Sequence, residues 1–281
     1  MLAEKIPCLI CVSKTDLNYL FEYSLKTCLK NIDFLSEIFI VTPNPELAKV
    51  VISNNSSSCQ IPIHLLNDSL FLSKKENEMC GWSKQQLLKL RCNEITKSEN
   101  ILSVGADTVI IKNLLLQSFY NTKNIIVNFR MHDSEKKHFY FEINRVKNIY
   151  ALLGIKPSSA FDENFKDYIF DVFLFNNHLL LELKKYLLKK FGADYFFKLF
   201  PRQINGYEDM NQIGEWSLYT IFAIEVLKYP FVFQDGTKFL HQVHTQKELS
   251  NYDFKNDAVH FVRKDFDKNY IFTQLKKHNI L

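Results

Sequence analysis

The sequence predicts an α/β protein with a mostly parallel central sheet flanked by helices, and the order of its elements supports this prediction. Apolar runs at 6–12, 38–41 and 61–66 have the length and composition of buried strands. The segments between them, at 17–28 and 46–52, have the apolar spacing of helices. Strand, helix, strand, helix, strand is the order that opens a parallel sheet of the nucleotide-binding, Rossmann-like type.

Residues that favour turns separate these first elements. Ser13-Lys14-Thr15-Asp16 follows the first strand, and Ser, Thr and Asp are all common helix N-caps. Thr42-Pro43-Asn44-Pro45 ends the second strand, and Asn67-Asp68 ends the third. The first three strands therefore all end in polar residues on the same edge of the expected sheet.

The rest of the chain continues to alternate between strands and helices. Helices are expected at 81–100, 142–153, 178–191 and 215–227, and strands at 101–111, 125–129, 168–175 and 231–234. No repeat, low-complexity tract or linker interrupts the pattern. We therefore expect one continuous domain over residues 1–281.

The charge and cysteine content narrow the class of protein. With 35 basic and 31 acidic residues, the formal net charge is +4. This balance argues against a nucleic-acid partner, and it suits an anionic ligand or a peripheral contact with an anionic membrane. Cys8 and Cys11 have CxxC spacing but would point to opposite faces of a strand, so zinc is not expected. We expect reduced thiols and a cytoplasmic protein that contacts the inner membrane only peripherally.

The expected strand at 101–111 contains the turn Gly105-Ala106-Asp107-Thr108. Burying an unpaired carboxylate is costly. Asp107 is therefore expected at a strand end, facing a cation or a sugar hydroxyl. The alternative is that Asp107 only caps the turn.

Several motifs together resemble a family of bacterial GT-A-fold glycosyltransferases that build surface polysaccharides such as capsule and lipopolysaccharide. The motifs are Gly81-Trp82-x-x-Gln85-Gln86-x-x-Lys89, the Asp107-Thr108 turn and Glu215-Trp-Ser-Leu-Tyr219. They follow the opening strand in the family's order, and the Gln-Gln helix is the most specific of them. The resemblance implies a GT-A-like domain with a nucleotide-sugar-binding half at 1–113, and an acceptor-binding half with a C-terminal tail at 114–281.

The resemblance also implies a nucleotide-sugar donor, with a UDP-sugar as the default and CMP- or GDP-sugars as alternatives. A helix N-terminus after the first strand offers N–H groups to an anionic ligand. Lys89 is expected to reach the diphosphate or a sugar hydroxyl. The residues expected at the donor are Val12, Ser13, Asp16, Gln85, Lys89, Ala106 and Asp107.

In the family, an Asp-x-Asp turn binds a divalent cation, and here Gly105 replaces the first acid. Asp107 with either His241 or His244 is the expected set of metal ligands; these histidines would lie on opposite faces of a strand, so only one serves. The alternative is that both are ordinary histidines near a strand end. Three outcomes stay open. Mn²⁺ or Mg²⁺ binds through Asp107, one histidine and the diphosphate; the reaction is metal-independent, with Lys or Arg neutralising the leaving group; or the domain is inactive.

Two carboxylates are candidates for catalysis. Transfer with inversion, which we slightly favour, needs a base that removes the acceptor proton. Glu215, at the start of a helix, is the candidate base; alternatively it only complements the helix dipole. Asp171 is an unusual acid in the apolar segment 170–176. It either binds the donor sugar or acceptor, or is buried and satisfied by backbone N–H groups.

The expected function is transfer of a sugar to a hydroxyl of a saccharide or lipid-linked acceptor, in bacterial surface glycan synthesis. The alternative is a non-catalytic GT-A-like subunit that binds a glycan or acts as a scaffold in a polysaccharide synthase. The glycine at position 105 motivates this alternative.

Overall fold

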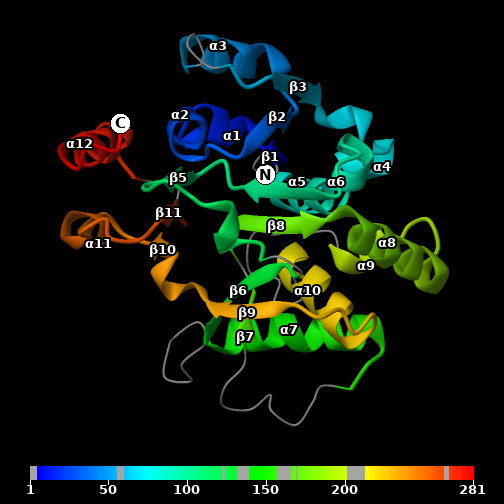
Figure 1. Cartoon of the computed structure of the whole chain (residues 1–281). Coiled ribbons are helices and arrows are strands. Elements are labelled where there is room, and N and C mark those ends of the chain that lie inside the picture. Colours follow the sequence, from blue (N-terminus) through cyan, green and yellow to red (C-terminus); the bar gives the residue numbers. More distant parts are fainter. Residues whose placement is uncertain are drawn as a thin grey trace.

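A five-stranded sheet forms the centre of the protein (Figure 1). The computed structural model describes residues 5–55, 60–121, 124–131, 139–156, 166–168, 170–200, 213–262 and 266–281. The strands are β1 (Ile6–Cys11), β2 (Leu35–Thr42), β3 (Ile63–Asn67), β4 (Asn100–Val104) and β8 (Val172–Asn176), in the order β3-β2-β1-β4-β8. The first four run parallel, and β8 is antiparallel to β4. This arrangement confirms the predicted mostly parallel α/β sheet.

Helices cover both faces of this sheet (Figure 1). Near one face lie α1 (Lys14–Leu17), α2 (Phe21–Asn31) and α3 (Pro45–Asn55), which contact one another. The other group is α5 (Gly81–Leu90), α6 (Cys92–Ile95), α7 (Phe139–Leu153), α8 (Asn177–Phe191) and α10 (Glu215–Glu225). In this group α10 packs against α5, α7 and α8. Among the described residues, no helix is both long and apolar enough to cross a bilayer.

Two three-stranded sheets lie beside the central one. One has the order β10-β11-β5 and is formed by β5 (Thr108–Ile110), β10 (Leu240–Val243) and β11 (Ala258–Phe261). The other has the order β7-β6-β9 and is formed by β6 (Ile126–Met131), β7 (Lys166–Asp167) and β9 (Val232–Asp235). The segment 101–111, expected as one strand, is thus two strands in two sheets. The turn at Gly105 carries the chain from β4 in the central sheet to β5.

The remaining elements are short or C-terminal. They are η1 (Asp68–Leu70), α4 (Lys74–Asn77), η2 (Leu116–Ser118), α9 (Phe196–Leu199), η4 (Gly236–Lys238), α11 (Gln246–Asn251) and α12 (Lys268–Lys277). Figure 1 shows α11 and α12 at one end of the molecule, near β5, β10 and β11.

A second apolar core anchors this C-terminal end. Val259 and Phe261 of β11 are fully buried in it, together with Val109 of β5 and Ile271 of α12. Fully burying an aliphatic side chain contributes about 1.5–3 kcal/mol relative to leaving it exposed. Strand β11 is therefore held firmly, and so is His260, whose side chain leaves the opposite face of the strand.

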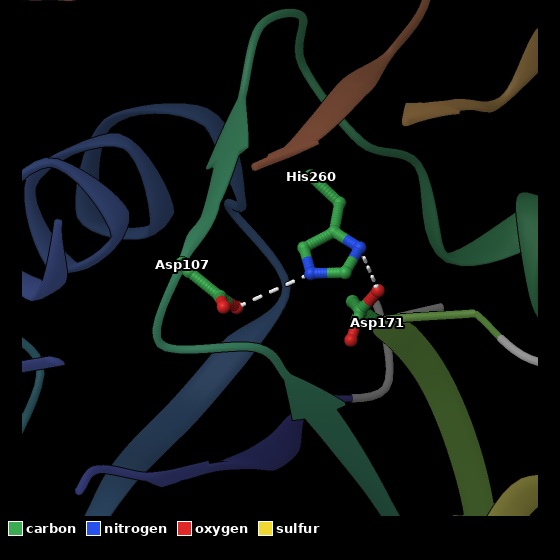
Figure 2. Close-up of side chains that lie close together, drawn as sticks. All are labelled: Asp107, Asp171 and His260. Carbon is green, nitrogen blue, oxygen red and sulfur yellow. Dashed lines mark ion pairs between the residues drawn. The ribbon is translucent and has the colours of Figure 1, made fainter. Parts of the chain in front are cut away.

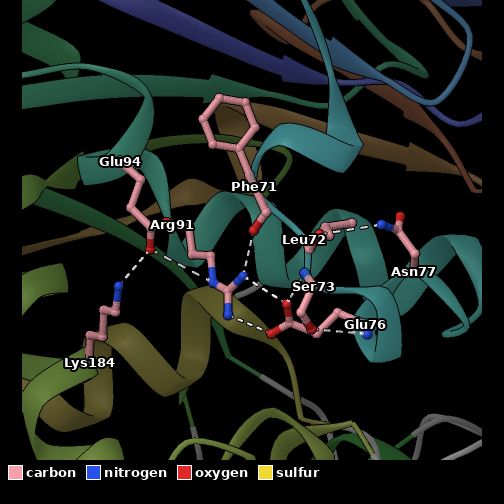
Figure 3. A network of polar contacts seen from close by, with 8 residues as sticks. All are labelled: Phe71, Leu72, Ser73, Glu76, Asn77, Arg91, Glu94 and Lys184. Carbon is pink, nitrogen blue, oxygen red and sulfur yellow. Dashed lines mark hydrogen bonds and ion pairs between the residues drawn. The ribbon is translucent and has the colours of Figure 1, made fainter.

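A polar network holds the end of α5 against its neighbours (Figure 3). Arg91 donates to the carbonyl of Phe71 at 2.6 Å and contacts the carboxylate of Glu76 at 2.5 Å. Glu94 lies 3.8 Å from Arg91 and 2.8 Å from Lys184 of α8. The network therefore joins α4, α5, α6 and α8, and it supports the helix that carries the Gln-Gln motif.

Three element boundaries differ from the sequence-based expectation. The strand expected at 168–175 begins only at Val172, and β7 just before it pairs with β6 and not with the central sheet. The helix expected from residue 17 begins at Phe21, after the short helix α1. The helix expected at 81–100 ends at Leu90, and α6 and the first residue of β4 occupy the rest of that segment.

Candidate active site

Hydrogen bonds from distant elements hold the turn that carries Asp107. The backbone N–H of Gly105 donates to the carbonyl of Asp171 at 2.7 Å, and the hydroxyl of Ser24 donates to the carbonyl of Gly105 at 2.9 Å. The carbonyl of Asp107 accepts from the N–H of Phe261 at 3.1 Å. Three parts of the chain, on α2, β8 and β11, thus converge on one turn. Ala106, expected at the donor, is buried within it.

Asp107, Asp171 and His260 form one group, called here the acid–histidine cluster (Figure 2). His260 Nδ1 lies 2.6 Å from Asp171 Oδ2, and His260 Nε2 lies 3.6 Å from Asp107 Oδ1. The side chains are 9% (Asp171), 14% (His260) and 19% (Asp107) exposed. The cluster is therefore largely shielded from water, and Asp107 is its most accessible member.

The electrostatics of the acid–histidine cluster favour a positive charge at its centre. Burial alone would lower the pKa of His260, but Asp171 and Asp107 outweigh it and raise this pKa to about 10. Burial likewise would raise the pKa of Asp171, and His260, Lys89 and Arg130 instead lower it. Without a metal ion, two carboxylates therefore face one imidazolium, and His260 has to release this proton before it can bind a metal. Their potential ligand atoms lie within 4.8 Å of one another, and Asp and His are common ligands of divalent metals. The residues present thus fit a divalent cation.

The structure does not bring His241 or His244, the expected metal ligands, into this cluster. In the pairing of β10 with β11, His241 lies opposite Val259, and Gln242 lies opposite His260. His241 therefore points to the other face of the sheet, where its ring stacks on Tyr252 with a centroid distance of 4.4 Å. His244 lies after the end of β10, and its backbone N–H donates to Glu248.

His260, which sequence reasoning missed, carries one recognisable signal. It is a single polar residue in the apolar run Val259-His260-Phe261-Val262. Asp171 has the same signal in its own strand, and it was singled out for that reason. A polar residue within an apolar strand therefore marks both members of the cluster that lie outside the Asp107 turn.

The residues expected at the nucleotide form a network at the end of β1. The Ser13 hydroxyl donates to Asp16 Oδ2 at 2.6 Å, and Asp16 N donates back to Ser13 Oγ at 3.2 Å. Gln85 of α5 donates to the same carboxylate oxygen and to the carbonyl of Cys11, both at 3.1 Å. Val12 is buried beside them. The structure thus brings these four expected donor residues together, and the first residue of the Gln-Gln pair anchors the loop.

Lys89 and Glu215 form a second charged group, called here the buried ion pair. Lys89 Nζ lies 2.8 Å from Glu215 Oε1, and the side chains are 6% and 0% exposed. Lys89 Nζ also lies 4.0 Å from the ring centroid of Trp216. The side-chain amide of Gln86 reaches both Glu215 and Trp82 when its nitrogen faces the carboxylate and its oxygen faces the indole N–H. Gln86, the second residue of the Gln-Gln pair, thus hydrogen-bonds to the buried ion pair.

The surroundings of the buried ion pair fit a structural contact between α5 and α10. Burial is the main cause that raises the pKa of Glu215, and Lys89 opposes it. A general base has to reach the acceptor hydroxyl within hydrogen-bond distance. Glu215 has no exposed surface in this state and is already engaged by Lys89. Lys89, whose side chain is 6% exposed, contacts Glu215 and also interacts electrostatically with Asp171.

The fold is that of glycosyltransferases. Mouse xyloside xylosyltransferase 1, in its apo form, matches with a TM-score of 0.54 and 13% identity, over 94% of this chain and 100% of its own. The bifunctional glycosyltransferase WbbM, also apo, matches with a TM-score of 0.55 and 10% identity, over 94% of this chain. The chain spans 46% of the length of WbbM.

Within that fold, the chain belongs to a family of unknown function, DUF6492, whose model matches residues 15–278. No curated protein matches it in sequence.

Proposed function

We propose that this protein is a glycosyltransferase that uses a nucleotide-sugar donor. The acid–histidine cluster carries the proposal, because it joins a turn at the carboxyl end of β4 to β8 and β11. Ligands of open α/β sheets bind outside the carboxyl ends of the strands. The fold shared with known glycosyltransferases supports the same class of reaction.

In the proposed complex, the nucleotide lies against the loop after β1 and the diphosphate lies toward Asp107. Gln85 holds Asp16, and Asp16 holds Ser13, so the loop keeps its shape before the donor arrives. Preorganisation of this kind lowers the cost of binding. A UDP-sugar is the default donor. We propose a saccharide or lipid-linked hydroxyl as acceptor and a bacterial surface glycan as product.

Asp107, Asp171 and His260 would hold the divalent cation. Mn²⁺ or Mg²⁺ held by these residues would offset the negative charge that develops on the leaving diphosphate. In this proposal, the protein holds the carboxylates of Asp107 and Asp171 and the imidazole of His260 close together before the donor binds. We assign the buried ion pair to holding α5 and α10 in register.

The test is a panel of UDP-, GDP- and CMP-sugars, each incubated with the purified protein with and without Mn²⁺. We expect one nucleotide class to raise the thermal unfolding temperature, and its sugar to be released slowly or transferred, faster with Mn²⁺. The matched control is Asp107→Asn, which should lose the Mn²⁺ response. No release from any donor, together with no thermal shift by any nucleotide, would reject the proposal.

One observation favours a second candidate, a non-catalytic subunit that binds a glycan. The side chain of Glu215, the expected base, has no exposed surface and is paired with Lys89. This candidate predicts that oligosaccharides stabilise the protein while nucleotide sugars do not. Glycan binding without donor binding would decide for it.

A further inference from the structure

Gly105 and Asp171 face each other across two antiparallel strands. Val104, the last residue of β4, pairs with Val172, the first residue of β8. The hydrogen bond from Gly105 N to Asp171 O, at 2.7 Å, extends this ladder by one step. In the Asp-x-Asp motif of the glycosyltransferases that this sequence resembles, position 105 would hold the first acid. Here that position lies next to Asp171, an acid from a distant part of the chain.

The two positions share one space. A Cβ atom built on Gly105 would lie 3.1 Å from the Cβ of Asp171 and 3.2 Å from Asp107 Oδ1. It would also lie 2.7 Å from Thr108 Oγ1, closer than carbon and oxygen atoms can pack. A side chain at position 105 is thus excluded while Asp171 and Thr108 stay where they are.

A buried carboxylate at position 171, directly before β8, is energetically costly. Asp171 is 7% exposed as a whole residue and lies between Phe170 and Val172, which are both buried. A buried carboxylate needs a compensating partner. The nearest partner is His260, whose Nδ1 is 2.6 Å away. The carboxylate thus contacts one ring nitrogen of His260, and the possible ligand atoms of Asp107, Asp171 and His260 lie within 4.8 Å of one another.

We propose that the first acid of the Asp-x-Asp motif has moved from position 105 to position 171. Asp171 then supplies the second carboxylate of a divalent-cation site, and Gly105 leaves the room that Asp171 needs. This inference rests on the proposed function, because the cation serves the nucleotide-sugar donor. Two carboxylates and one imidazole form a mixed oxygen and nitrogen ligand set, which suits Mn²⁺.

The first test is Mn²⁺ binding to the protein without donor, followed by the loss of the free-ion electron paramagnetic resonance signal. Asp171→Asn keeps the shape of the side chain and removes its charge. Loss of even an outer partner of a metal ligand weakens binding by about 10–100-fold, so we expect at least about a tenfold loss. Asp194→Asn, which removes a carboxylate paired with Lys75, is the matched control and should bind as the wild type does.

The second test moves the acid back to the turn. The variant combines Gly105→Asp, Asp171→Gly and Thr108→Ala. The Thr108 hydroxyl is buried and has no hydrogen-bond partner among the described residues, so its removal leaves nothing unpaired. We expect Mn²⁺ affinity within about tenfold of the wild type, against the larger loss expected for a missing ligand. Gly105→Asp alone should lower the thermal unfolding temperature, because two side chains then compete for one space.

The outcomes separate this inference from the proposed function. Wild-type Mn²⁺ affinity in Asp171→Asn overturns the inference and leaves the transferase proposal intact. If the wild-type protein binds nucleotide sugars but no Mn²⁺, the inference is likewise overturned and the transferase proposal stands. Failure to bind any nucleotide overturns both. If the triple variant does not fold, as judged by circular dichroism, Asp171→Asn still tests the inference, because wild-type Mn²⁺ affinity in that variant would overturn it.

Discussion

The two charged groups of this protein are built from the same kinds of residue and differ in balance and burial. The acid–histidine cluster has two carboxylates for one base and side chains that are 9–19% exposed. The buried ion pair has one carboxylate for one amine, at 0% and 6% exposure. The first has two acids for one histidine, a charge excess that fits the proposed divalent cation, whereas the second pairs one acid with one amine and is buried between α5 and α10. The ratio of acidic to basic groups and the exposed fraction of their side chains therefore distinguish the proposed binding site from the structural contact better than the residue types do.

The largest expected effect comes from breaking the buried ion pair. Lys89→Met leaves Glu215 as an uncompensated buried charge, which destabilises a protein by about 3–5 kcal/mol. The double variant Lys89→Met with Glu215→Gln removes that charge and should regain much of the loss. The free energy of unfolding in urea measures both. Equal stability of the single variant and the wild type would show that the pair is not structural.

Whereas Lys89→Met should lower the stability, Asp107→Asn should lower the rate of donor turnover and change the stability little. Removing one group that stabilises charge in a transition state costs about 100-fold in rate, or roughly 2.7 kcal/mol. Because Asp107 is the most exposed member of its cluster, its urea unfolding midpoint should change little. Donor turnover and urea unfolding are measured on the same preparation. An active Asp107→Asn protein that still responds to Mn²⁺ would mean that the site lies elsewhere.

The ion pair between Glu76 and Arg91 should make the stability of the protein depend on pH. Burial would raise the pKa of Glu76, but Arg91 and Ser73 outweigh it and lower this pKa below its unfolded value of 4.5. The stabilisation is therefore fully present above pH 4.5 and is lost as the pH falls through the lower, folded value. A hydrogen bond to a charged group contributes roughly 2 kcal/mol. Urea unfolding from pH 7 to pH 3 should show this loss in the wild type and less of it in Glu76→Gln.

The smallest expected effect is a difference in Mn²⁺ affinity between variants of His260, in the cluster, and of His241, on the opposite face of the sheet. His260→Gln removes a ligand atom and should weaken Mn²⁺ binding by about tenfold or more. His241→Gln loses only the ring stacking on Tyr252 and should change Mn²⁺ affinity less than about twofold, since it lies outside the cluster. Calorimetric titration of both variants is the measurement. Weaker binding in His241→Gln than in His260→Gln would reverse the assignment.

The sequence predicted the α/β fold because strands and helices differ in their apolar period, and local residues set that period. It also pointed to Asp107 and Asp171, because each is an acid in an apolar setting. It did not predict the pairing of Lys89 with Glu215, which lie 126 residues apart. It did not predict the place of His260 either, because the register of β11 on β5 and β10 depends on packing against α12.

The most direct test of the central claim is a crystal soaked with Mn²⁺ and a uridine diphosphate. We expect an anomalous manganese peak next to Asp107, Asp171 and His260, with the diphosphate beside it. A bound nucleotide with manganese held by other residues, or with no manganese at the cluster, would contradict it.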